Sequence, residues 1–112
     1  AALTLLNDPT FLEAARALAV LVIEQGGETD REQIHWLFKC VLSREDSKAE
    51  GEAVEILLGK SRAYFQNNPQ AAQQLQTNGQ LKLAKSVDLN EASAWTMLCR
   101  VVLNLNETIT RN

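Results

Sequence analysis

The stretch DLNEASAWTMLCRVVLNLNETI, residues 88–109, carries the pattern that decides the fold class. Its apolar residues recur at the three- and four-residue spacing of one helix face. Asp88 followed three residues later by Glu91 predicts a capped helix start. The apolar stripe consists of Trp95, Leu98, Cys99, Val102, Leu105 and Ile109. We therefore expect a long amphipathic helix here.

The rest of the chain repeats this helical pattern. A helix is expected to begin at Pro9, with Asp8 as its N-cap, and to end at Gly26–Gly27. Capping-box spacings at the starts of residues 29–44 and 47–66 predict two more helices, and residues 69–76 predict a short one. A turn at 3–6 and an irregular stretch at 81–87 complete the prediction. We expect an all-α, compact bundle of about five helices, in a single domain covering residues 1–112.

Composition is that of an ordinary globular domain. Hydrophobic residues make up 46% of the 112 residues, charged residues 22%, and the net charge is −3. The 11 lysines and arginines form no basic run, so nucleic acid is not an expected partner. The longest apolar run, residues 17–23, is far shorter than the roughly 20 residues that span a bilayer. No targeting signal and no initiator Met are present, which is typical of a fragment of a larger protein.

Two local features leave alternatives open. The helix from Pro9 is apolar almost all round near residues 17–23, which predicts that it is the central helix of the bundle, or else that one side meets a partner. Gly51 and Gly59 lie inside the helix 47–66. They either let another helix approach closely or are simply tolerated. Each glycine makes the helix less favourable by about 1 kcal/mol relative to Ala.

The two cysteines, Cys40 and Cys99, lie in apolar helical stretches. Buried free thiols are the favoured interpretation, and a disulfide joining two helices is the alternative. Neither cysteine belongs to a CxxC or CxxCH motif, so no covalent haem site is expected in this segment.

The sequence contains no reaction constellation that we can identify. His35 is the only histidine, and HExxH, GxSxG and P-loop motifs are absent, so we expect no metal, cofactor or catalytic residue in this segment. Acidic residues such as Glu50 gather where helices start, and the helix dipole accounts for them there.

Two asparagines interrupt the apolar pattern near the C-terminal end of the last expected helix. If the helix continues, Asn106 lies on the core side and needs hydrogen-bond partners, for example at the turn 7–9. If the helix stops near Asn104, Asn106 caps a short terminal turn. Asn104 lies roughly opposite Trp95 on the helix and is expected at the surface or at a helix end.

Three quoted stretches resemble a known family. ALTLLNDPTFLEAARALA (2–19), LSREDSKAE (42–50) and AWTMLCRVVLNLNETITR (94–111) are similar, in order and spacing, to a planctomycete-specific domain of unknown function found in cytochrome-c-associated multidomain proteins. Asp46 stands where that family usually has proline, and Thr108 where an aromatic is common. The positions that match the family motifs are Asn7, Asp8, Pro9, Arg44, Glu50, Trp95, Asn104, Asn106 and Glu107.

The resemblance implies a context rather than a mechanism. Family members are typically large, exported bacterial proteins with a cytochrome-c-type haem domain on the N-terminal side. By resemblance alone, an extracytoplasmic or cell-envelope location is expected, with haem held elsewhere in the parent protein. This chain would then be its C-terminal segment.

Three functional hypotheses follow. The first is a non-catalytic structural or interaction module that packs against other domains of the parent protein or recruits a protein partner. The second is that acids such as Glu50 or Glu107 complete a hydrolase-type or redox active site whose other residues lie upstream. The third is a ligand pocket between the helices that carry Trp36 and Trp95.

Overall fold

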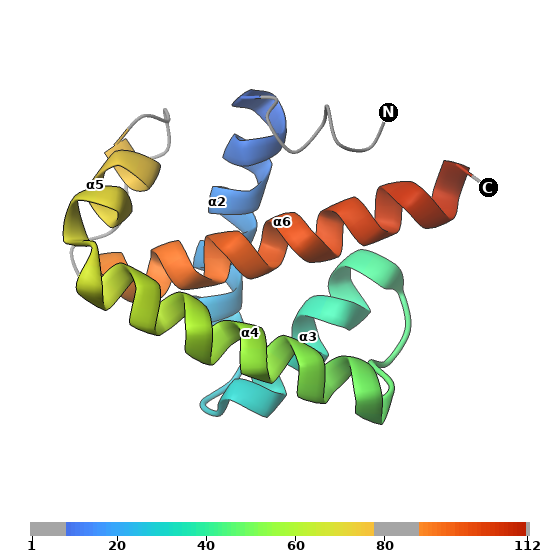
Figure 1. Cartoon of the computed structure of the whole chain (residues 1–112). Coiled ribbons are helices and arrows are strands. Elements are labelled where there is room, and N and C mark those ends of the chain that lie inside the picture. Colours follow the sequence, from blue (N-terminus) through green and yellow to red (C-terminus); the bar gives the residue numbers. More distant parts are fainter. Residues whose placement is uncertain (1–8, 78–87, 112) are drawn as a thin grey trace.

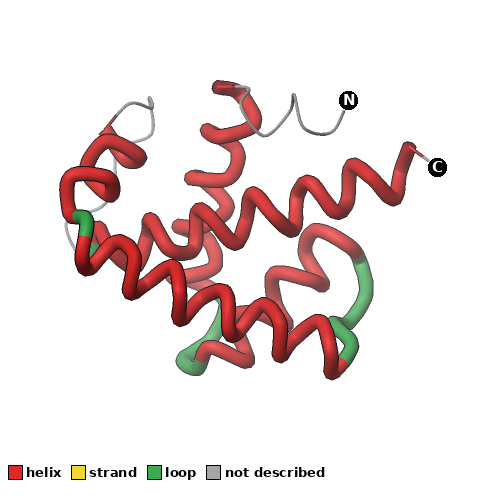
Figure 2. The backbone as a smooth tube through the Cα atoms, in the orientation of Figure 1, coloured by secondary structure: helices red, strands yellow, loops and turns green. Residues whose placement is uncertain are grey.

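The computed structural model describes residues 9–77 and 88–111, with side chains for residues 10–76 and 88–106. Within these ranges the regular structure is entirely α-helical, which confirms the all-α fold of about five helices (Figures 1 and 2). The expected turn at 3–6 and the stretch 81–87 lie outside the described residues. The helices are α2 (Pro9–Gln25), α3 (Asp30–Leu42), α4 (Lys48–Asn67), α5 (Pro69–Thr77) and α6 (Leu89–Arg111).

Side-chain caps fix three of the helix starts. Thr29, Ser47 and Asp88 each accept a hydrogen bond from the backbone N–H three residues on, at 3.2, 3.1 and 3.0 Å. Only Ser47 forms the full capping box, because Glu50 returns a bond to the Ser47 N–H at 2.9 Å. At the other two starts the glutamate carboxylate binds side chains instead.

Two helix ends use left-handed backbone. Gly27 has φ +117° directly after α2, as expected of a glycine stop. Ser43 ends α3 with φ 58°, and its N–H donates to the Lys39 carbonyl at 3.2 Å. The end of α3 has serine in place of glycine, so the sequence carries no glycine that would predict it.

The central helix is α6, not α2. The helix α6 packs against α2, α3, α4 and α5, and Figure 1 shows it crossing the molecule with the others around it. The buried apolar side chains of α2 include the small Ala15 and Ala19, whereas Leu21 is 40% exposed. The prediction of a central α2 was therefore wrong, because an apolar surface all round a helix does not require burial all round.

The other predicted stripes are largely correct. Side chains at the expected spacing on α3, α4 and α6 form one core, and the partly buried Leu57 packs against it. The buried members on these three helices are Ile34, Leu37, Phe38, Val54, Leu58, Phe65, Trp95, Leu98, Cys99 and Val102.

The two glycines of α4 differ. A Cβ added at buried Gly51 would lie well inside contact distance of the Asp46 carboxylate, so this position needs glycine for close approach of a neighbouring loop. A Cβ at Gly59 would meet nothing within 4 Å. Gly59 is therefore tolerated rather than required, and it lowers the helix propensity of α4.

Gly59→Ala is expected to raise the free energy of unfolding by about 0.5–1 kcal/mol, because alanine is the better helix former and no atom opposes its Cβ. Urea denaturation measures the change. Gly51→Ala is the matched control on the same helix, and its gain should be smaller or negative because Asp46 must move. Equal gains at both positions would contradict this account.

Candidate functional site

Arg44 and Glu50, both predicted site residues, form a polar cluster at the start of α4. Nη1 and Nη2 of Arg44 donate to Oε1 and Oε2 of Glu50, both at 2.8 Å. The Ser47 N–H also donates to Glu50 at 2.9 Å. The Arg44 bonds, followed by the backbone bond from Ser47, lower the pKa of Glu50 from 4.5 to about 2. The same pairing raises the pKa of Arg44.

This cluster locks a helix start and is poorly suited to proton transfer. A general acid or base works best with a pKa near the operating pH, which the Glu50 carboxyl is far below. Both of its oxygens already accept hydrogen bonds. The geometry therefore does not favour Glu50 as the acid of a catalytic site.

Asp46 stands where the resemblance expects proline, and its side chain ties the loop before α4 to α3. Its Oδ1 lies 3.3 Å from Nδ1 of His35, and Nε2 of His35 lies 3.9 Å from the Glu45 carboxylate. These side-chain contacts therefore hold the loop in place, although residue 46 lacks the rigid proline ring that the resemblance expects.

Trp95 is fully buried, and its polar atom is held by a network that reaches three helices. Its indole N–H donates to Glu91 at 3.2 Å. Arg62 of α4 donates to the same Glu91 carboxylate through Nε at 2.9 Å and through Nη2. Nη1 and Nη2 of Arg62 also bind Asp30 of α3, at 2.8 and 2.9 Å. Trp95 therefore lies in the hydrophobic core, and its indole N–H belongs to this hydrogen-bond network.

The Arg62 network places two carboxylates on one guanidinium. Accepting hydrogen bonds from Arg62 lowers the pKa of Asp30, and donating to Asp30 and Glu91 raises the pKa of Arg62. Both acids lie in the first turn of a helix, where negative charge is favoured. The network gives both acids one shared cation and joins α3, α4 and α6.

Sequence reasoning missed Arg62 as an organising residue. The residue follows Val54 and Leu58 at four-residue steps and precedes Phe65 by three, so it lies on the line of buried side chains. An arginine on an apolar line is the available signal that a buried or half-buried partner exists.

A second set of buried polar groups holds α5. Gln76 donates to Ser93 at 3.3 Å and to Thr96 at 3.1 Å, both on α6. Arg16 of α2 is 3% exposed and donates through Nε to the Leu75 carbonyl. These bonds satisfy groups that would be costly to bury alone, and they attach α5 to α6 and α2.

The two asparagines lie inside α6, since the helix runs to Arg111. The alternative in which Asn106 caps a terminal turn is therefore wrong. Asn104, expected at the surface or a helix end, is partly buried in mid-helix, and its Oδ1 is inaccessible to solvent. Asn106 is also partly buried, as the continuous helix predicts. Neither residue is without a partner, and the predicted bond to the turn 7–9 falls outside the described residues.

The remaining predicted positions lie at the ends of the chain. Asn7 and Asp8 are outside the described residues. Pro9 is the first residue of α2, as expected, and Glu107 belongs to α6, but their side chains are not described. Whether Glu107 contributes to chemistry stays a prediction.

Both cysteines are free thiols. Cys99 is fully buried, and burial raises the pKa of its thiol, so it is unreactive as a nucleophile. Cys40 is exposed, which corrects the expectation that both thiols are buried. The reason is that Cys40 lies beside the core stripe of α3 and not on it.

Described residues line two surface clefts that bear on this prediction, and neither cleft is lined by both tryptophans. One, of about 470 Å³, is lined by Trp36 and neighbouring residues of α3 with Gly26, and Trp95 is buried elsewhere. The predicted pocket between their helices is therefore not one of these two clefts. The other cleft, of about 520 Å³, lies between α4, α5 and α6.

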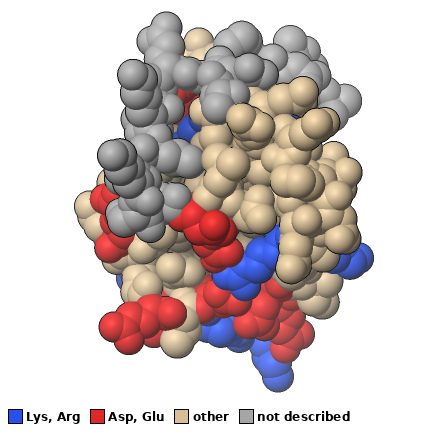
Figure 3. Space-filling view, turned by 90° about the vertical axis from the view of Figure 1, so that its left-hand side faces the viewer, with Lys and Arg blue, Asp and Glu red and all other residues tan. Residues whose placement is uncertain are grey.

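Charged side chains of both signs lie together on part of the surface. Lys and Arg side chains lie directly against Asp and Glu on the face shown in Figure 3. Within the described ranges, no three His, Cys, Asp or Glu side chains gather as a metal site would require. No described helix has the length and apolar character needed to cross a bilayer.

Neither a protein-family model, nor a curated protein, nor a solved structure matches this chain.

Acid is expected to remove part of the stability through Glu50. Because folding lowers its pKa, its contribution is fully present above pH 4.5 and is lost as the pH falls toward about 2. Glu50→Gln should flatten the pH dependence of the unfolding free energy across that window, measured by urea denaturation. Glu52→Gln, an exposed neighbour, is the control and should keep the wild-type slope. An unchanged slope in Glu50→Gln would refute the role of this carboxylate.

Arg62→Met is expected to lower the free energy of unfolding by about 1–3 kcal/mol, because it leaves two half-buried carboxylates without their cation. Arg31→Met removes an exposed pair, 3.7 Å from Glu55, and should cost at most about 0.5 kcal/mol. Chemical denaturation compares the two. Equal costs would show that Arg62 is an ordinary surface arginine.

Proposed function

We propose that this chain is a non-catalytic helical module with which a larger, exported, cytochrome-c-associated bacterial protein packs against its own upstream domains or recruits a protein partner. The exported location and the haem domain rest on the sequence resemblance alone. Any haem would be held outside this segment.

The observation that carries the proposal is the division of polar and apolar groups in the fold. The acids Glu50, Asp30 and Glu91 are each bound by an arginine, and Glu50 also accepts the N–H of Ser47 at a helix start. By contrast, Ile56 of α4 is 61% exposed and Val101 of α6 is 46% exposed. The pairing of these acids with arginines, together with the large apolar side chains exposed on α4 and α6, supports docking rather than catalysis.

A catalytic role has less support than the role of a docking module. It would require Glu50 to exchange its bonds with Arg44 and Ser47 for contacts with substrate, at a pKa far from neutrality. The other proposed acid, Glu107, has a side chain outside the described residues.

Association with the upstream part of the parent protein tests the proposal. We expect the 112-residue chain to co-elute in size-exclusion chromatography with the separately purified upstream region. Ile56→Glu should weaken that association, because it places a charge at the large apolar side chain that is most exposed among the described residues. Ala49→Glu, at another exposed position of α4, is the matched control. Separate elution of the two wild-type proteins at high micromolar concentration would refute the packing role.

A further inference from the structure

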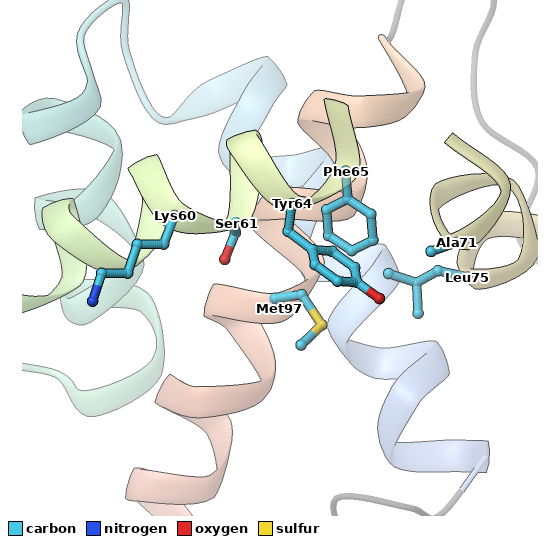
Figure 4. Close-up of a pocket in the computed structure, with 7 residues that line it drawn as sticks. All are labelled: Lys60, Ser61, Tyr64, Phe65, Ala71, Leu75 and Met97. Atoms are coloured by element: carbon cyan, nitrogen blue, oxygen red, sulfur yellow. The ribbon is translucent and has the colours of Figure 1, made fainter. Parts of the chain in front are cut away.

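The cleft between α4, α5 and α6 has the size and lining of a small-molecule site. Its volume is about 520 Å³, inside the range of about 300–1,000 Å³ typical of such sites. Three helices contribute, so its shape depends on the packing of the bundle. It is lined by Lys60, Ser61, Tyr64, Phe65, Ala71, Leu75 and Met97 (Figure 4).

Most of this lining is apolar. Phe65 is buried and meets the ring of Tyr64 edge-on, with ring centres 5.1 Å apart and planes at 83°. Tyr64 itself is 55% exposed, so the cleft opens to solvent beside an aromatic ring. Met97 supplies an adaptable thioether, which suits an apolar chain of variable shape.

The two ends of the cleft differ in charge. Lys60 extends away from the other labelled side chains in Figure 4, whereas Ala71 and Leu75 lie at the opposite end, on α5. Among the described residues Lys60 makes no ion pair, unlike Arg44 and Arg62. An apolar trough with one uncompensated cation at its end is complementary to an apolar chain with one anionic head.

We propose that this cleft binds an apolar carboxylate of the medium-chain fatty acid type. The hydrocarbon tail lies along Tyr64 and Met97 toward Leu75, and the carboxylate faces the Lys60 ammonium. The binding step is reversible and forms no covalent bond. Ile56 lies one helical turn before Lys60 but does not line the cleft, so the ligand proposal does not rest on the proposed packing role.

Three ten-carbon probes test the proposal on the wild-type chain, each below its micellar concentration: decanoate, decanol and decyltrimethylammonium. Amide chemical shifts in ¹⁵N-labelled protein report both the site and the affinity. Decanoate should shift the amides of Ser61, Ala71 and Leu75 and bind more tightly than decanol, with the cationic probe weakest. Decanoate shifts elsewhere, or equal affinity for all three probes, would overturn the proposal.

Two pairs of variants separate the charge from the apolar contact. Lys60→Gln should weaken decanoate about two- to five-fold and leave decanol unchanged, as for an exposed ion pair. Lys48→Gln, on the same helix but outside the cleft, should change neither. Tyr64→Ser should weaken both decanoate and decanol about five-fold, whereas Ile56→Ser should weaken neither. Tyr64 and Ile56 are both exposed, so these variants are expected to stay folded. Lys60→Gln without effect on decanoate would refute the carboxylate site.

Discussion

The bridge from Arg62 to Asp30 and Glu91 is the interaction on which the arrangement of α3, α4 and α6 depends. Its chemistry follows from where these helices begin. An acid in the first turn of a helix is favoured by the helix dipole, but two such acids brought together repel each other. A guanidinium resolves this conflict, because its planar fork can donate to both carboxylates at once. The bundle can therefore bring the starts of α3 and α6 to one side of α4 without leaving two uncompensated charges.

The same bridge explains how a tryptophan is buried in the middle of α6. Trp95 is fully enclosed, and its indole N–H would be costly there without an acceptor. Glu91 supplies that acceptor one helical turn earlier and is itself held by Arg62. On the other side of α6, the hydroxyls of Ser93 and Thr96 accept hydrogen bonds from the side-chain amide of Gln76 on α5. Polar bonds thus fix the neighbours of α6, and apolar packing fills the space between them.

Local features of this fold could be predicted from sequence, and long-range pairings could not. The periodicity of α6 and the caps at Thr29, Ser47 and Asp88 involve residues a few positions apart, so their physical signals lie in short windows. Arg62 binds residues 32 and 29 positions away, and no single window contains both partners. The incorrect prediction that α2 is the central helix has the same origin. Hydrophobicity indicates which faces can be buried, but only the packing of all helices decides that α6 lies at the centre. Glu50 was recognised as a helix-start acid, yet its bond to Arg44 needed the fold of the connecting loop.

The proposed ligand site depends on a positive charge that forms no ion pair within the described part of the fold. Four arginines, Arg16, Arg31, Arg44 and Arg62, are paired with acids within the described chain, and three of those pairs lie between residues of different helices or loops. Such pairing removes cations from the surface as sites for external anions. Lys60 is different, because it lies at the end of an apolar cleft where no described acid reaches it. In the proposed complex, a ligand of matching charge and shape covers the apolar surface of the cleft while its carboxylate faces the exposed Lys60 ammonium. Ion pairs therefore help to hold the described helices together where α3, α4 and α6 meet, whereas the cleft between α4, α5 and α6 is open to solvent.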